Sequence, residues 1–270
     1  MDATSYILLS LVGVVAGVLG GLLGIGGSSV MLPAMVWILG ATVGGVEQIH
    51  QYMAAAMIVN FLLILPSVAA HVRNGAVWPK VWKVLVASAL VGIVVGVQVS
   101  YFFDKARAKY LRWFVGVFFV YVVLDNLRRM VRPSLTAGVA RERIEALGAW
   151  RKAAVGFPMG VIAGLLGIGG GSLAVPGQQL VLKMPLRNAI ANSAATIASV
   201  SWLGAIMKNV QLGSHGSAGR SLILATCLAP TAMIGSYVGG HLTHRLPLRI
   251  VRTAFIGIMV LAALKMFGWV

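Results

Sequence analysis

Two glycine- and serine-rich stretches contain the residues best suited to chemistry in this sequence. They read GGLLGIGGSSVMLP at 20–33 and AGLLGIGGGSLAVP at 163–176. Glycine disfavours helix, and backbone N–H groups freed at membrane depth are tolerated only where they line a protein cavity. At the start of a new helix, such groups and the helix dipole favour an anion. Each stretch therefore predicts an anion-binding break in a helix. The predicted substrate-binding residues are Gly26, Gly27, Ser28, Ser29, Gly169, Gly170, Gly171 and Ser172.

Close helix packing is the alternative role for glycines in apolar segments. Small residues four positions apart let two helix backbones approach each other in lipid. We interpret five such pairs as packing positions: Gly13/Gly17, Gly17/Gly21, Gly92/Gly96, Gly160/Gly164 and Gly235/Gly239. We interpret the glycine runs that follow Gly21 and Gly164 as the breaks. The serines after these runs are N-cap candidates of the short helices that follow. These candidates are Ser28, Ser29 and Ser172.

Further polar side chains fall inside apolar runs, where they are costly and usually face the bundle interior. Asn192 and Thr196 lie four residues apart, on one helical face, shortly after the second glycine stretch. Together with Ser193 they are predicted to add hydrogen bonds to the substrate. The alternative for each is a hydrogen bond between helices. The secondary candidates are His50, Gln51 and Asn60, at the comparable place after the first stretch, and Gln178.

The ionisable residues argue against a carboxylate proton relay. The chain has six acidic residues, and none lies clearly inside a span, which suits an anion pathway. His50, His71 and His241 titrate near neutral pH in their ordinary state, but an interfacial or loop position is the expectation for each. Lys208 ends an apolar run, so we expect its side chain to extend to the membrane interface. The alternative is that its positive charge attracts an anion.

Catalytic motifs are absent from the sequence. The Gly-x-Gly pairs lack the strand and the acidic residue of a dinucleotide site, and no Gly-Lys-Ser/Thr follows them. His-Glu-x-x-His, Gly-x-Ser-x-Gly and Cys/His clusters are also missing, and the single cysteine, Cys227, lies in an apolar run. We therefore expect no enzyme, metal or cofactor. An intramembrane hydrolase using Ser28 or Ser172 is the remaining enzymatic alternative.

The composition is that of an integral membrane protein. Of the 270 residues, 59% are hydrophobic and 10% are charged, against about 25% charged in soluble domains. Uncharged runs alternate with short basic loops, which predicts an all-α polytopic protein with about eight transmembrane helices. The net charge of +16 is spread over these loops and does not indicate nucleic-acid binding. The uncharged runs are 3–46, 48–72, 84–103, 113–124, 153–182, 188–207, 221–244 and 253–264.

The two glycine-rich stretches also indicate an internal repeat. At an offset of 143, positions 17–33 match positions 160–176 with 11 identities in 17. We predict two homologous halves, 1–130 and 150–270, each with a Gly-rich broken helix, joined by a polar linker loop over 131–149. The linker is basic, which favours the cytoplasm. An odd number of spans per half would invert the halves, and an even number would make them parallel.

The paired motifs GLLGIGGSSVMLP and GLLGIGGGSLAVP, in a chain of this size, resemble the sulfite exporter TauE/SafE family. HVRNGAVW at 71–78 and ALVGIVVG at 89–96 are weaker motifs of the same resemblance. The resemblance implies a multi-pass permease of the bacterial inner membrane that moves sulfite, sulfoacetate or other small organosulfur anions. The first motif has Ser28 where the second has Gly171, so we expect the halves to contribute unequally.

The residues and the resemblance together predict a secondary transporter that works as an exporter. It would move a small anion such as sulfite, sulfoacetate or another organosulfonate across the bacterial inner (plasma) membrane, with one half rocking against the other. A passive anion channel and a membrane scaffold or accessory subunit without transport are the alternatives. The predicted partners are the anion and the lipid bilayer, without nucleic acid; a homo-oligomer is compatible with the sequence.

Overall fold

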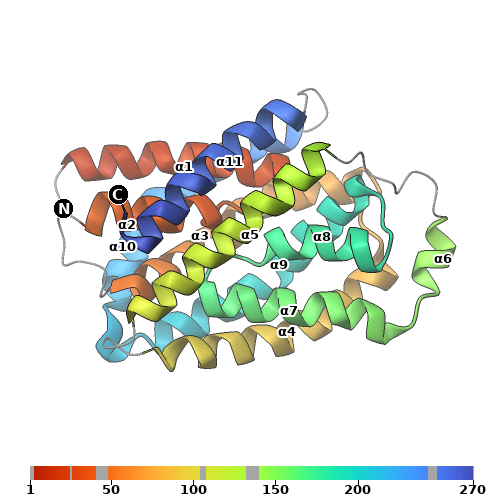
Figure 1. Ribbon diagram of the computed structural model, residues 1–270, viewed down its shortest axis with the longest axis horizontal. Helices are drawn as coiled ribbons and strands as arrows, with labels where there is room; N and C mark the ends of the chain where they lie inside the picture. Colours follow the sequence, from red (N-terminus) through yellow and green to blue (C-terminus); the bar gives the residue numbers. More distant parts are fainter. Residues whose placement is uncertain are drawn as a thin grey trace.

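The described parts of the chain form helices and their connections, as the sequence predicts. The computed structural model describes residues 3–24, 26–40, 48–103, 108–131, 140–242 and 248–269. Most of the long helices lie roughly along the long axis of the molecule, and the short α6 stands apart at one end (Figure 1). The elements are α1 (Ala3–Leu23), α2 (Ser28–Gly40), α3 (Ile49–Arg73), α4 (Pro79–Tyr101), α5 (Ala108–Val131), α6 (Arg141–Glu145), α7 (Ala149–Leu166), α8 (Gly171–Val181), α9 (Leu186–Val210), η3 (Gly213–His215), α10 (Ala218–Leu242) and α11 (Leu248–Phe267).

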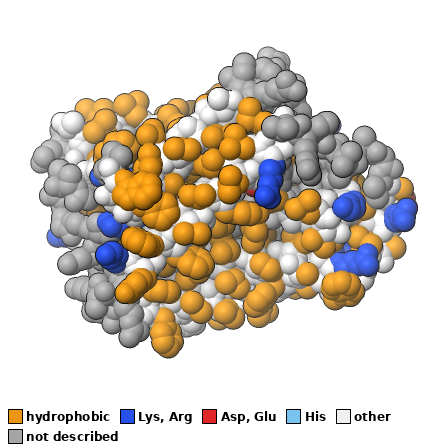
Figure 2. All heavy atoms as spheres, in the orientation of Figure 1, with side chains coloured by type: hydrophobic (Ala, Val, Ile, Leu, Met, Phe, Trp, Pro, Cys, Tyr) orange, Lys and Arg blue, Asp and Glu red, His pale blue; other side chains and the backbone are white. Residues whose placement is uncertain are grey.

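Six of the described helices are long and apolar enough to cross a membrane, namely α1, α3, α4, α5, α9 and α10. The helix α2 and the described part of α11, Thr253–Phe267, are shorter apolar helices. Hydrophobic side chains cover the middle of the molecular face in Figure 2, and most of the visible Lys and Arg lie toward its two ends. The chain is therefore a multi-pass membrane protein. By length and composition its described spans number six, where the sequence predicted about eight.

Two pairs of helices, α1 with α10 and α4 with α7, pack with their backbones in close approach. A methyl group added at Gly17 would overlap the carbonyl of Ala232, and one added at Gly160 would overlap the carbonyl of Ala89. These contacts are equivalent, because both partners are shifted by 143 residues. The predicted packing glycines are confirmed. They face the backbone of the neighbouring helix: Gly13, Gly17 and Gly21 on α1, Gly92 and Gly96 on α4, Gly160 and Gly164 on α7, and Gly235 and Gly239 on α10. Gly156 on α7, which was not predicted, does the same.

The helices α3 and α9 cross at the centre of the bundle and run antiparallel. Asn60 of α3 donates to Ser201 of α9, and toward one end Met53 meets Lys208. An offset of 143 would make these two helices equivalent, so equivalent helices point in opposite directions. This is the geometry that an inverted repeat produces.

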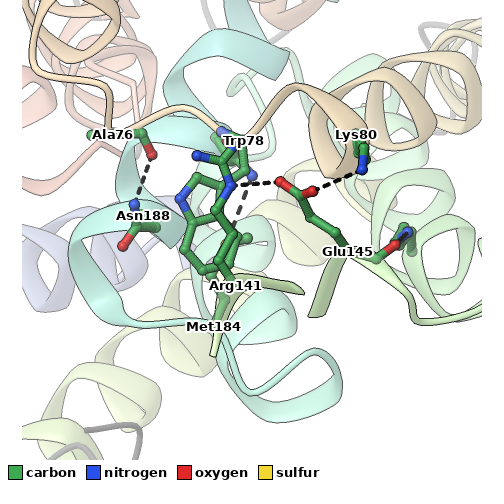
Figure 3. A network of polar contacts seen from close by, with 9 residues as sticks. Ala76, Trp78, Lys80, Arg141, Glu145, Met184 and Asn188 are labelled. Atoms are coloured by element: carbon green, nitrogen blue, oxygen red, sulfur yellow. Dashed lines mark hydrogen bonds and ion pairs between the residues drawn. The ribbon is translucent and has the colours of Figure 1, made fainter. Parts of the chain in front are cut away.

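The helix α6 caps the end of the molecule where α4 begins. The Glu145 carboxylate accepts a hydrogen bond from Arg141 Nε at 2.6 Å and lies 3.4 Å from Lys80 Nζ of α4. The Arg141 guanidinium covers the ring of Trp78, 5.6 Å from its centroid, and Lys152 Nζ donates to the Glu145 carbonyl at 2.8 Å. Figure 3 shows the side chains of Lys80 and Arg141 pointing toward the Glu145 carboxylate, with Arg141 against Trp78. The predicted linker loop thus contains a helix that is held against α4.

Replacing Glu145 with glutamine is expected to loosen α6. The hydrogen bond from Arg141, and further the Lys80 ammonium, hold the pKa of Glu145 below its usual range. A carboxyl whose folded pKa lies below its unfolded pKa stabilises the fold above the unfolded pKa, and this contribution is lost as pH falls through the folded pKa. Hydrogen exchange of residues 141–147 should therefore be faster in E145Q than in wild type at neutral pH.

The matched control for this variant is Glu142→Gln, because Glu142 is exposed on the same helix. E142Q should exchange like wild type. Acidification should bring the protection factors of wild type toward those of E145Q, whose own protection factors should stay unchanged. Equal exchange in wild type and E145Q at neutral pH would show that the carboxylate does not hold α6.

Candidate functional site

The breaks after α1 and α7 are built alike. Gly24 and Gly167 take left-handed φ values of +63° and +68° at the two helix ends, a conformation that glycine adopts without steric cost. The chain then turns back, so that Gly27 lies against the backbone of α1 and Gly170 against the backbone of α7. Each break is consequently a tight helical hairpin, α1–α2 or α7–α8, whose short second helix begins deep in the protein.

Both hairpins converge on one side chain amide, that of Asn60 near the middle of α3. Gly26 and Gly169, which are 143 residues apart, both lie directly against it, with φ values of +81° and +74°. Asn60 is fully buried, and its Nδ2 donates to Ser201 Oγ at 3.3 Å. Its Oδ1 has no hydrogen-bond partner among the described residues. The N-termini of α2 and α8 therefore approach the same buried polar point, which we call the Asn60 junction.

Hydrogen-bond donors are available at the Asn60 junction. The first backbone hydrogen bonds of α2 run from the N–H groups of Val30 and Met31 to the Gly27 carbonyl. Those of α8 run from the N–H groups of Leu173 and Ala174 to the Gly170 carbonyl. The N–H groups before them have no acceptor within their own helix. Three serine hydroxyls in the first turns are buried and have no partner in the described parts of the chain, namely those of Ser28, Ser29 and Ser172.

The predicted N-cap role of these serines is wrong for both short helices. Helix α2 already begins at Ser28, its first bonds go to the Gly27 carbonyl, and the hydroxyls of Ser28 and Ser29 cap no N–H group of the described residues. The same holds for α8. The N-cap position is Gly170, with a φ of +69° and no side-chain cap, because the left-handed turn there needs glycine. Ser172 is therefore two positions inside the helix. Its hydroxyl has no hydrogen-bond partner in the described structure.

The three residues predicted on α9 have different environments. The Asn192 amide holds the start of α4, since Oδ1 accepts from Trp78 N at 2.8 Å. Thr196 Oγ1 donates to the Asn192 carbonyl at 2.7 Å. The buried Ser193 hydroxyl has no partner among the described residues. Gly24, at the end of α1, packs against Ile190 of α9. Ser193 follows Ile190 by three residues and shares its helical face. Ser193 therefore lies on the face of α9 that is turned toward the first hairpin.

Of the secondary candidates, only Asn60 reaches the junction in the described contacts. Gln178 Nε2 donates to the Ala189 carbonyl at 3.3 Å and thereby ties α8 to α9. Gln51 Oε1 accepts from Ser217 N at 3.0 Å. Gln51 also helps to line a cavity of about 220 Å³ with Arg220, near the starts of α3 and α10.

The fourth secondary candidate, His50, belongs to a second buried cluster, with Lys208 at its centre. The expectation that Lys208 extends to the interface is wrong, because its side chain is 0% exposed and Nζ donates to Ser100 Oγ at 2.7 Å. The Ser100 hydroxyl lies 3.5 Å from His50 Nδ1, and Tyr101 OH donates to the Lys208 carbonyl at 2.5 Å. Ser100 and Tyr101 were not predicted as part of a site; their only signal in the sequence is polarity at the end of an uncharged run.

A buried polar junction between two hairpins, inside a bundle of membrane-length helices, is the central feature of this multi-pass membrane protein. Within the described ranges, no group of three or more His, Cys, Asp or Glu is placed to hold a metal ion. The chain belongs to the sulfite exporter TauE/SafE family, whose model matches residues 9–266. The family resemblance of the glycine motifs is thereby confirmed.

The curated relatives are membrane transporters by name. The probable membrane transporter protein MamO of Magnetospirillum gryphiswaldense is 26% identical over 96% of this chain, which spans 44% of that relative. The probable membrane transporter protein YunE of Bacillus subtilis is 27% identical over 90% of either chain. The chain thus spans less than half of the MamO length and most of YunE. No solved structure matches it.

Replacing Gly26 or Gly169 with alanine is expected to destabilise the protein by about 2–5 kcal/mol. The left-handed backbone costs a non-glycine residue about 1–2 kcal/mol, and the new methyl would collide with the Asn60 amide, which adds an overpacking cost of about 1–3 kcal/mol. Gly75→Ala is the control, because Gly75 has a φ of +61° and open space around it. Denaturant unfolding in detergent measures the three losses. Equal losses would mean that the hairpins do not press on Asn60.

Proposed function

We propose that this protein is a secondary transporter that exports a small anion such as sulfite, sulfoacetate or another organosulfonate across the bacterial inner membrane. Membership of the TauE/SafE family supports the class of substrate. The observation that carries the proposal is the contact of Gly26 and Gly169 with one amide, that of Asn60. This contact brings the N-termini of α2 and α8 to the same point.

The Asn60 junction has the chemistry of an oxyanion site. Each helix N-terminus carries the equivalent of about half a positive charge, and two of them reinforce each other where they meet. Backbone N–H groups and serine hydroxyls can donate to the oxygens of a sulfite or sulfonate group. The proposed ligands are the backbone and hydroxyl groups of 26–29 and 169–172, with additional hydrogen bonds from Asn192, Ser193 and Thr196. Ser193 supports this assignment best, because its hydroxyl is unpartnered in the described structure.

The proposed architecture is two homologous halves, 1–130 and 150–270, in an inverted arrangement around α3 and α9. The equivalent contacts at an offset of 143 in the α1–α10 and α4–α7 pairs support it. In this arrangement α7 and α11 also cross the membrane, beside α4 and α5, and the short helices α2 and α8 return along α1 and α7. Each half then has five membrane helices, an odd number, as an inverted arrangement requires. Rocking of the halves about the Asn60 junction would then expose the site alternately to either side.

Flux of radiolabelled sulfite, sulfoacetate and methanesulfonate in proteoliposomes tests the proposal. A carrier should accumulate label by counterflow when unlabelled substrate is saturating inside. Flux without counterflow would favour a passive anion channel. Neither binding nor flux of any of the three anions would overturn the proposal and favour a scaffold or accessory subunit.

A further inference from the structure

A lysine without a carboxylate partner among the described residues is fully buried near the end of α9. Lys208 Nζ donates to Ser100 Oγ at 2.7 Å and lies 3.9 Å from Met53 Sδ. The ring of Tyr101 covers it, with its centroid 5.4 Å from Nζ. The acidic residues that the structure describes lie on α5 and α6 and form no ion pair with Lys208: Asp125, Glu142 and Glu145.

Met53 connects Lys208 with the second hairpin. The Gly167 turn at the end of α7 lies directly against Met53 Cα and Cβ, and the sulfur of the same side chain lies beside Lys208 Nζ. Asn60 is seven residues, about two turns, further along α3. The Lys208 amine therefore lies one side chain away from the hairpin. Water screens a charge only weakly in such a buried environment.

A directed chain of hydrogen bonds leads from Lys208 toward the end of the bundle. The Phe103 carbonyl can only accept, so His50 Nε2, 2.8 Å away, carries a proton and donates it. In the neutral ring, Nδ1 then accepts from the Ser100 hydroxyl, which in turn accepts from Lys208. His215 of η3, which is partly exposed, packs edge-on against His50 with centroids 5.0 Å apart. These bonds point outward, so a proton moves inward to a neutral amine only when they reverse. Ser100 then gives its hydroxyl proton to Lys208 Nζ and takes one from the His50 ring, which is reprotonated from the aqueous end.

A buried charge is costly unless a counter-charge accompanies it. We propose, on the basis of the proposed function, that the Lys208 amine is neutral in the empty transporter and takes up one proton when a small anion binds at the Asn60 junction. The proton comes from the aqueous end through the Ser100–His50 chain. The resulting ammonium balances one negative charge of the anion, so that anion and proton are carried together.

Other titratable groups lie around Lys208, and proton uptake by them must be distinguished from proton uptake by Lys208. They are His50 on α3, Tyr101 on α4 and His215 on η3. Asp104 and Lys105, which follow α4 in the sequence, lie outside the described residues. His50→Gln removes the nearest alternative proton acceptor while leaving Lys208 in place.

The test is calorimetric titration of the purified full chain with methanesulfonate and with sulfoacetate, because neither anion takes up a proton near neutral pH. Titration in buffers of different ionisation enthalpy counts the protons taken up. At mildly alkaline pH, wild type and H50Q should take up about one proton per anion. K208R, with a fixed charge, should bind without proton uptake, and K208M should bind at least tenfold more weakly without uptake. The matched control K83M, at an exposed lysine, should behave like wild type.

Proton uptake that persists in K208M or K208R, or that disappears in H50Q alone, would overturn the assignment to Lys208. Anion binding by wild type without proton uptake would overturn the inference and leave the proposed anion site standing. Wild type that binds none of sulfite, sulfoacetate and methanesulfonate would overturn the proposed function, and the inference with it.

Discussion

Asn60→Asp is expected to abolish transport and to weaken anion binding at least about 100-fold, or about 2.8 kcal/mol. The substitution hardly changes the shape of the side chain, so the contacts with Gly26 and Gly169 can be kept. It places a carboxylate where two helix N-termini meet, and this group would satisfy the donors intended for the substrate. It would also repel an incoming anion. Calorimetry with sulfite and proteoliposome flux measure the two effects.

The stability of the Asn60→Asp protein separates this mechanism from misfolding. Burying a carboxylate is costly, but the two positive helix ends oppose this cost, so a cooperative thermal transition should be retained while binding is lost. The control is Asn126→Asp on α5, at a part-buried asparagine that bonds only its own helix, through the Val122 carbonyl. Unchanged binding in N60D would show that the anion does not bind at the Asn60 junction.

Gly160→Val is expected to destabilise the protein by at least about 3 kcal/mol, because overpacking a close interface costs about 1–3 kcal/mol and more where backbone must move. The first carbon of the new side chain would already overlap the Ala89 carbonyl, so α4 and α7 must separate. The same loss is expected for Gly17→Val, because Gly17 meets the Ala232 carbonyl of α10 in the equivalent way. Denaturant titration in detergent micelles measures the free energy of unfolding.

The control for both glycine variants is Gly257→Val on α11. A side chain at Gly257 would meet no atom within 4 Å, so its effect should stay within about 0.5 kcal/mol. A small loss in G160V together with a large loss in G17V would contradict the equivalence of the two interfaces. Comparable losses would support the proposed inverted arrangement of the halves.

The fold class and the positions of the helical breaks follow from local properties of the sequence. Long uncharged runs must become helices in lipid, because backbone groups there have no water to bond. Left-handed turns at Gly24 and Gly167 occur where the glycine runs predicted an interruption, since glycine alone pays no steric cost there. The packing glycines were also predictable, because small residues in membrane helices mark close contacts.

The ranking of the polar residues was not predictable in this way. The sequence favours Asn192 over Asn60 as a substrate-binding residue, because Asn192 follows the second glycine stretch and shares a helical face with Thr196. In the structure, however, the Asn192 amide holds the start of α4. Asn60 touches both glycine turns, which come from segments more than one hundred residues apart. No local pattern indicates which long-range contact an asparagine makes, because helix crossing and rotation decide it.

The sequence by itself determined an all-α membrane protein and a set of close-packing glycines, and it predicted two glycine breaks at an offset of 143. These features depend on hydropathy, backbone sterics and side-chain size, which act within a few residues. Only the tertiary structure decided that α3 and α9 run antiparallel, that both breaks meet at Asn60, and that Lys208 is buried beside Ser100. These features depend on which helices pack together, and therefore on contacts between residues far apart in the chain.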